Sequence, residues 1–497
     1  MRTTNDREHG KKNVLLVTVD HWPGSLLGCA GRGDILSPSI DALSRCGVRF
    51  SNAYSATPVC IPARRELMTG TCAKTHGDRG FNEFQEMPAG LPTLPQVFRD
   101  NGYQAYAVGK LHVYPQRARI GFDDVLLNEE SRRVNYPHEM REDDYARFMA
   151  REGYSGLNDA HGMSNNDYIT RPWHLPEHLH QTSWTARQMC ETIIRRDPGR
   201  PAFWYCGFTA PHPPLVPPKT FLDKYGDAEI AMPETGEWAK NFEDLPYCLK
   251  YYSSIFNIKT EKPIRDALKA FFALCTHIDF SLRLVIGTLR EEKALDNTII
   301  AITCDHGDML GTHGLWAKNV FYENSSKVPF IIIPAESDKR LKPGSVDERL
   351  VELRDMMPTL LDLADIPIPK TVEGMSLLDS RRRDYIYGEL WEDDRATRMI
   401  RTEKFKLIYY AVGNRLQLFD MTHDPAENHD LSGDPAHAKT LAELTGILVS
   451  RLYGADRSWL RDGKLVGLED KEFAFKPSQE NVGILKNREL LIQRGIR

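Results

Sequence analysis

Residues 13–21 read NVLLVTVDH, and this stretch decides the fold of the chain. Seven uncharged residues rich in valine and leucine are typical of a strand that is buried on both faces of a parallel sheet. The run ends directly at Asp20 and His21. Open α/β sheets build their sites at the carboxyl ends of parallel strands, so the stretch predicts an α/β fold with a site at this point. Taken alone, the pair also fits a loop aspartate beside a histidine that caps a neighbouring element.

The same pattern recurs along the chain. Further buried strands that lead into polar residues are expected at 103–108, 201–209 and 297–304. After residue 375 the apolar runs are shorter, have one polar face and alternate with turn residues, at 383–389, 397–401, 405–410 and 415–420. We therefore expect an α/β fold with a large, mixed, mostly parallel sheet sandwiched by helices in residues 1–375. A smaller C-terminal subdomain of antiparallel sheet plus helix is expected in residues 376–497.

The composition is that of an ordinary globular chain. Of its 497 residues, 41% are apolar and 27% are charged, so the chain is long enough to bury a large core. The net charge of −5 and the lack of a basic block argue against nucleic acid. The first apolar run is too short to cross a membrane, and no membrane partner is expected. The beginning lacks the apolar core of a secretory signal and the nine cysteines are scattered, so we expect reduced thiols and a cytoplasmic protein.

A second decisive stretch is residues 57–70, TPVCIPARRELMTG. Pro62 suits the first turn of a helix, which places Cys60 at the helix N-terminus, where free N–H groups and the dipole favour an anion. Arg64, one turn on, can offer a planar fork of donors to the same spot. These residues describe a nucleophile beside an oxyanion pocket. A buried structural cysteine is the usual alternative for any single cysteine.

The spacing Cys-x-Pro-x-Arg resembles the signature of the type I sulfatases of the alkaline phosphatase superfamily. In that family the cysteine is oxidised to formylglycine. The stretch 305–318, DHGDMLGTHGLWAK, resembles the choline sulfatase and phosphonate monoester hydrolase branch. Two shorter elements, Gly-Lys-x-His at 109–112 and Pro-His-x-Pro at 211–214, are also similar to family motifs. Without the resemblance they would be a surface turn and a rigid loop with an incidental histidine.

The resemblance implies a set of site residues. The catalytic residues would be Cys60, Arg64, Lys110, His112, His212 and Lys318. The metal ligands would be Asp20, His21, Cys60, Asp305 and His306. No organic cofactor site is implied. The metal of the family is usually Ca²⁺, but two imidazole ligands would fit a softer ion, with Mn²⁺ as the alternative. His21 departs from the common family residue at its position.

The roles follow from the same resemblance. Lys110 would bind substrate oxygens, and His112 would orient the formylglycine hydroxyl. His212 would act as general acid or donate to the sulfate, and Lys318 would bridge substrate and nucleophile. One hydroxyl of the hydrated aldehyde would attack sulfur while the other later expels sulfate. Residues 113–200 and 215–262 would form the substrate rim, and their sequence carries no readable code for the substrate.

The expected activity is that of a sulfuric ester hydrolase acting on a small sulfated sugar, alkyl sulfate or aryl sulfate. A phosphonate monoester or phosphodiester hydrolase with the same nucleophile and metal is the alternative. A non-catalytic anion-binding relative is a third hypothesis, against which the retained nucleophile and lysines argue. The expected partners are the small-molecule substrate and an enzyme that oxidises Cys60. The charged tail from Trp459 would wrap the body or a neighbouring subunit, so a homo-oligomer stays open.

Overall fold

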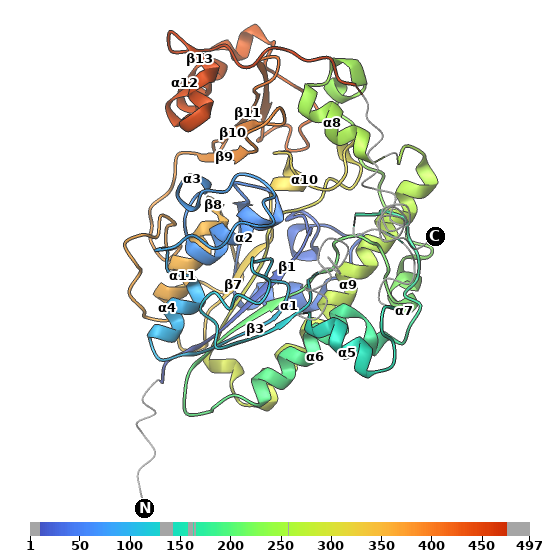
Figure 1. Cartoon of the computed structure of the whole chain (residues 1–497), viewed down its shortest axis with the longest axis vertical. Coiled ribbons are helices and arrows are strands. Elements are labelled where there is room, and N and C mark those ends of the chain that lie inside the picture. The colour runs from blue at the N-terminus through green and yellow to red at the C-terminus, as the bar shows by residue number, and fades with distance from the viewer. Residues whose placement is uncertain (1–9, 130–142, 158–162, 164–165, 257, 475–497) are drawn as a thin grey trace, which may run out of the picture.

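The computed structural model describes residues 10–129, 143–157, 163, 166–256 and 258–474 (Figure 1). An eight-stranded sheet runs through the larger part of the molecule, in the order β4-β3-β5-β1-β6-β7-β2-β8. Its strands are β1 Asn13–Val19, β2 Val48–Tyr54, β3 Gln104–Gly109, β4 Asp124–Leu127, β5 Ala202–Gly207, β6 Thr298–Cys304, β7 Phe330–Ile333 and β8 Ser345–Glu352. The expected mixed, mostly parallel sheet is confirmed. Only β7 runs against its neighbours, β6 and β2.

The strand β1 lies in the middle of this sheet. It pairs in parallel with β5 on one side and with β6 on the other, so that Val14 lies between Phe203 and Ile299. Every residue of β1 after Asn13 is buried. Strands enclosed on both faces must be apolar throughout, which is why the sequence signal was continuous instead of alternating. The parallel set β3, β5, β1 and β6 brings its four carboxyl ends to one edge.

Helices cover both faces of the sheet. In Figure 1, α2, α3, α4 and α11 lie on one side, and α5, α6, α7 and α9 lie on the other. Their bounds are α1 Pro38–Cys46, α2 Cys60–Thr69, α3 Ala73–His76, α4 Leu94–Asp100, α5 Asp144–Arg151, α6 Gln181–Ile194, α7 Lys219–Leu222, α8 Tyr247–Ile255, α9 Glu261–Glu291, α10 Glu323–Ser326 and α11 Met356–Leu363. By length and composition α9 could cross a membrane, but 72% of its most apolar window is buried inside the protein. It packs against α6 as a core helix would.

The C-terminal part is a four-stranded antiparallel sheet in the order β12-β11-β10-β9, packed against α12 Ala438–Arg451. Its strands are β9 Ile386–Leu390, β10 Thr397–Arg401, β11 Phe405–Tyr410 and β12 Arg415–Asp420, followed by the short pair β13 Leu460–Arg461 and β14 Lys464–Leu465. One hydrophobic cluster joins this sheet to the body, since it contains Tyr54 and Met309 as well as Met399 and Phe419. The boundary near residue 375 marks a change of topology, and as a domain boundary it stays a prediction.

The expectation that residues 113–200 form a rim is too broad. The strand β4 extends the large sheet at its edge, and α6 packs on β3 and β5 in the body of the protein. Their patterns were weak because β4 has only four residues and α6 mixes polar with apolar positions. The strand β8 was not predicted, because Ser345–Glu352 alternates exposed and half-buried positions before it becomes buried. The other predicted rim residues, as far as the structure describes them, stay a prediction.

Candidate active site

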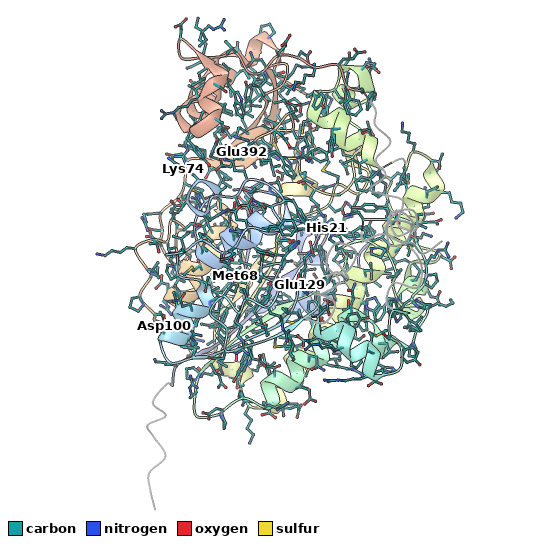
Figure 2. The ribbon with its side chains drawn as sticks, viewed as in Figure 1. His21, Met68, Lys74, Asp100, Glu129 and Glu392 are labelled. Carbon is teal, nitrogen blue, oxygen red and sulfur yellow. The ribbon has the colours of Figure 1, made fainter. Side chains whose placement is uncertain are left out.

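The predicted site residues come together at one edge of the large sheet. Asp20 and His21 follow β1, Lys110 follows β3, and Asp305 and His306 follow β6. All ten predicted residues are buried, with exposed fractions of their surfaces between 0% and 9%. Figure 2, in which His21 and Glu129 are labelled, places both near the centre of the molecule. The convergence follows from the parallel pairing of these strands, as the sequence predicts.

Four potential metal ligands lie within 4.8 Å of one another: one atom each of Asp20, His21, Cys60 and His306. The Oδ1 atom of Asp20 is buried and accepts no hydrogen bond from the described residues. The Nε2 atoms of His306 and His21 lie 3.7 and 3.9 Å from it. The Sγ atom of Cys60 lies 3.1 Å from His306 Nε2.

The neighbours of the two Nδ1 atoms show which nitrogen of each ring carries the proton. His21 Nδ1 lies 2.7 Å from the carboxylate of Asp308, and His306 Nδ1 lies 2.9 Å from the carbonyl oxygen of Gly307. A carbonyl and a carboxylate accept hydrogen bonds, so Nδ1 is the protonated nitrogen in both rings. Two Nε2 lone pairs and one carboxylate oxygen therefore face one another. Such an arrangement is satisfied by a cation between them, so the residues present fit a divalent metal.

The charge states agree with this arrangement. Burial, followed by Lys318, holds the pKa of His21 well below its usual value, and burial also lowers the pKa of His306. Both rings are therefore neutral, as metal ligands must be. Burial alone would raise the pKa of Asp20, but the positive charges of Lys110 and Arg64 hold it well below its usual value. Asp20 is an ionised carboxylate, and its Oδ2 accepts from Lys110 Nζ.

Cys60 is the first residue of α2, as the position of Pro62 predicts. Burial raises the pKa of its thiol, although Lys110 and Lys318 act in the opposite direction. An unmodified Cys60 is therefore not activated as a thiolate.

Arg64 connects the ends of several strands. Its Nε donates to Asp305 Oδ2 over 3.0 Å, and its Nη1 donates to the Tyr205 hydroxyl over 2.8 Å and to the Lys110 carbonyl over 3.1 Å. Its Nη2 lies 3.7 Å from Asp20 Oδ2. The guanidinium thus braces three strand ends. Asp305, predicted as a ligand, lies outside the group of four, with its Oδ2 bonded to Arg64 and 3.8 Å from His306 Nε2.

Lys318 lies between two imidazoles. Its Nζ is 2.6 Å from His21 Nε2 and 3.4 Å from His212 Nε2. The Nδ1 of His212 donates to the Pro213 carbonyl over 2.6 Å, so its Nε2 also carries a lone pair. Burial, followed by Lys318, holds the pKa of His212 well below its usual value. In this arrangement Lys318 carries the proton and His212 accepts it, and the acid role of His212 stays a prediction.

The loop with Lys110 and His112 is fixed by a residue that the sequence analysis did not single out. Glu129 Oε1 accepts from the backbone N–H groups of Leu111 and His112 over 2.8 and 2.9 Å. His112 has a left-handed φ of 59°, and its ring packs edge-on against Phe81 with 5.4 Å between centroids. Glu129 lies in a polar stretch after β4, where no sequence pattern marked it.

The chain is similar to known sulfatases. Residues 12–366 match the family model described as Sulfatase, and residues 311–452 match that described as N-sulphoglucosamine sulphohydrolase, C-terminal. An arylsulfatase of Clostridium perfringens is 34% identical over 476 residues, which cover 92% of this chain and 97% of that protein. A choline-sulfatase of Rhizobium meliloti is 29% identical over 88% of this chain and 86% of its own length.

Solved structures agree on the fold. A phosphonate monoester hydrolase from Silicibacter pomeroyi superposes with a TM-score of 0.75 at 24% identity, covering 88% of this chain and 95% of that one. A protein solved with its substrate D-glucosamine-2-N,6-O-disulfate superposes with a TM-score of 0.70 at 20% identity, covering 88% and 97%. Because a family model spans most of its length and the arylsulfatase aligns along nearly all of it, this chain belongs to the sulfatase family and is a sulfuric ester hydrolase.

Proposed function

We propose that this enzyme hydrolyses a small organic sulfate ester, with residue 60 as formylglycine and one divalent cation held by Asp20, His21, His306 and residue 60. One observation carries the proposal: a buried carboxylate oxygen and the Nε2 lone pairs of two imidazoles converge beside Cys60. A sulfated sugar, an alkyl sulfate and an aryl sulfate all present the same anionic group to this site. The arylsulfatase and choline-sulfatase relatives support that range of substrates.

The metal would supply a positive charge beside residue 60, and the aldehyde hydrate would supply a hydroxyl nucleophile and a route to release sulfate. The chain's own residues do the rest. Lys110 and Lys318 are buried ammonium groups on either side of the convergent ligands, where they can neutralise sulfate oxygens as charge develops. Arg64 braces the strand ends, and its Nη2, which has no hydrogen-bond acceptor among the described residues, is directed toward Asp20.

The proton for the leaving alkoxide would come from the pair formed by Lys318 and His212. The Lys318 ammonium lies within reach of His212 Nε2, so a proton can pass between the two groups. Burial raises the pKa of the Cys60 thiol, so the unmodified residue would be a poor nucleophile. The maturation enzyme, the choice of Ca²⁺ or another ion, and a cytoplasmic location stay predictions of the sequence.

The test compares matched esters on the full chain. We expect 4-nitrophenyl sulfate to be cleaved faster than the corresponding phenylphosphonate monoester, and Cys60→Ala to lower turnover by at least about 10³-fold. Cys72→Ala, at a half-buried cysteine before α3, is the matched control and should leave turnover unchanged. Intact mass spectrometry reports whether residue 60 is thiol or aldehyde. A faster phosphonate reaction would support the alternative hydrolase, and full activity in Cys60→Ala would contradict both.

A further inference from the structure

We propose that Asp308 and Tyr168 hold His21 in the tautomer that presents its Nε2 lone pair to the cation, so that this centre prefers a first-row transition ion to Ca²⁺. The inference rests on the cation of the proposed function. It assigns positioning roles to two residues, Asp308 and Tyr168. It also explains what a histidine does at the position directly after the β1 aspartate.

Both nitrogens of the His21 ring point to the same tautomer. Nδ1 lies 2.7 Å from Asp308 Oδ2, a carboxylate that accepts hydrogen bonds. Nε2 lies 2.6 Å from the ammonium of Lys318, which can only donate. Nδ1 therefore carries the proton and Nε2 the lone pair. Two independent neighbours give this result. In the structure the Nε2 lone pair accepts from the Lys318 ammonium, whose place at this nitrogen a bound cation would take.

Asp308 is itself held on every side by donors. Its Oδ1 accepts from the backbone N–H groups of Leu310 and Ala317, both over 3.0 Å. Its Oδ2 accepts from the Tyr168 hydroxyl as well as from His21. All of these atoms are in a buried environment. The carboxylate cannot turn away from His21 without leaving at least one buried donor unsatisfied.

Tyr168 is held by packing on both sides. Its ring lies 4.7 Å from the ring of Trp316 and 5.2 Å from that of Phe256, measured between centroids. The residue comes from the segment before α6, far in sequence from β1 and β6. A histidine bonded to a carboxylate through its second nitrogen is the usual way in which proteins orient a metal-binding imidazole.

The donor set then determines the preferred ion. His306 is oriented in the same way by the Gly307 carbonyl, so the centre offers two imidazole nitrogens beside the Asp20 carboxylate and residue 60. Ca²⁺ is a hard cation that takes six to eight oxygen ligands. Imidazole nitrogen favours first-row transition ions, whose affinities rise from Mn²⁺ toward Co²⁺ and beyond. A second nitrogen at position 21 therefore shifts the preference away from Ca²⁺.

The experiment measures metal binding directly and needs no turnover. Full-length protein, freed of metal and checked by intact mass at residue 60, is titrated with Mn²⁺, Co²⁺ or Ca²⁺ by calorimetry, and the visible absorption of bound Co²⁺ is recorded. We expect Mn²⁺ and Co²⁺ to bind more tightly than Ca²⁺. His21→Gln, which replaces the nitrogen with an amide, should weaken Mn²⁺ and Co²⁺ by about 10- to 100-fold, weaken Ca²⁺ much less and change the Co²⁺ spectrum.

The double variant separates positioning from folding. Asp308→Asn should weaken Co²⁺ binding by about 10- to 100-fold in the native background and only slightly in the His21→Gln background, because the orienting bond then has nothing to orient. Tyr168→Phe should also weaken Co²⁺ binding, by a smaller factor. It replaces Asp308→Asn as the test if that variant does not fold. Asp279→Asn and Tyr252→Phe are the matched controls, since both residues are buried and absent from the convergent ligands.

Two results would overturn the inference. One is Ca²⁺ binding as tight as Mn²⁺ and Co²⁺ in the native protein. The other is an Asp308→Asn effect of equal size in both backgrounds. Hydrolysis of 4-nitrophenyl sulfate is measured separately on the native enzyme. An active sulfatase without the metal preference would therefore contradict this inference alone and leave the proposed function in place.

Discussion

Single residues in this site act mainly through buried charge. Lys110, Lys318 and Arg64 place positive groups against Asp20, His21 and Asp305 in a region closed to solvent. Charges are worth more there than at a surface, because water does not screen them. The neutral imidazoles add lone pairs without adding charge, so the balance favours an incoming sulfate anion. Each buried lysine should therefore matter for catalysis individually.

Lys318→Met removes the ammonium between His21 and His212 and keeps most of the side-chain volume. We expect kcat/KM for 4-nitrophenyl sulfate to fall by about 10²- to 10³-fold, since a preorganised donor to developing charge is lost. The kinetics are compared with those of Lys339→Met, an exposed lysine bonded to the Glu336 carbonyl. An unchanged kcat/KM in Lys318→Met would exclude this lysine from the catalytic group.

Glu66 on α2 should make stability depend on pH. Burial, followed by the nearby Glu352, raises the pKa of its carboxyl to about 8. The folded protein then keeps a proton that the unfolded chain releases near the ordinary value, so the free energy of unfolding falls as pH rises from about 4.5 to about 8. The limiting slope is about 1.4 kcal/mol per pH unit.

Glu66→Gln should remove this pH dependence. We expect the Tm of the variant minus the Tm of the native protein to increase from pH 5 to pH 8.5, with both followed by circular dichroism. The comparison at pH 5 is the internal control, because the native carboxyl is then protonated and resembles the amide. A Tm difference that stays constant over this range would mean that Glu66 is ionised in the folded protein.

At the scale of elements, the site depends on strand ends that approach one another closely. Gly109 ends β3 with a φ of +102°, and the Lys110 N–H donates to the Gly207 carbonyl of β5 over 2.9 Å. A Cβ atom at Gly109 would overlap that same carbonyl. Only glycine combines this dihedral angle with this approach, and the loop that carries Lys110 and His112 starts from it.

Gly109→Ala should therefore destabilise the protein by more than about 2 kcal/mol and lower activity by displacing Lys110. Gly287→Ala is the opposite case, since Gly287 lies inside α9 with no atom within 4 Å of an added Cβ. This second change should stabilise the protein by roughly 0.5–1 kcal/mol. Urea unfolding of both variants measures whether each change lowers or raises the free energy of unfolding. Equal changes in the two variants would show that the close approach of β3 and β5 imposes no constraint on residue 109.

At the scale of the molecule, buried charge also joins the C-terminal sheet to the body. Lys406 on β11 donates to the Phe321 carbonyl over 2.9 Å and to Glu323 and Glu427 over 2.7 Å each. Glu427 in turn accepts from the Glu323 backbone N–H over 2.7 Å. Figure 1 shows β9, β10 and β11 next to α10, which begins at Glu323. The lysine therefore neutralises two carboxylates at the junction.

Lys406→Met leaves the buried Glu427 without its counter-ion and Glu323 with Lys327 alone, and should cost about 3–5 kcal/mol of stability. Burial raises the pKa of Glu427 to about 7 even beside the lysine, so the loss should be larger at pH 8 than at pH 5.5. Thermal unfolding and limited proteolysis of the C-terminal sheet report the change. Lys471→Met, in an exposed ion pair with Asp394, should cost less than about 1 kcal/mol. Similar losses for both lysines would contradict the proposed role of the junction.

The amino-acid sequence by itself determined the strands and the residues at their ends. Runs such as residues 13–19 are apolar because both faces of the strand are buried, and this local signature survives without any partner. The strands at 397–401, 405–410 and 415–420 lie at their predicted bounds, because the turn residues between them are a local signal. The polar face that was expected is not found in β10, in which every residue is buried. The linear motif around Cys60 and the start of α2 were also readable locally.

Only the tertiary structure decided which groups meet. Arg64 bonds to Asp305 and Tyr205, and Tyr168 reaches Asp308, over separations of more than 100 residues along the chain. The antiparallel placement of β7 and the edge position of β8 likewise depend on pairing with distant strands. Polar groups buried by folding must find partners wherever the packed elements place them, and that requirement leaves no periodic pattern in the sequence. The sequence therefore identifies the candidate reacting residues, while packing of the whole chain determines their tautomers, charges and neighbours.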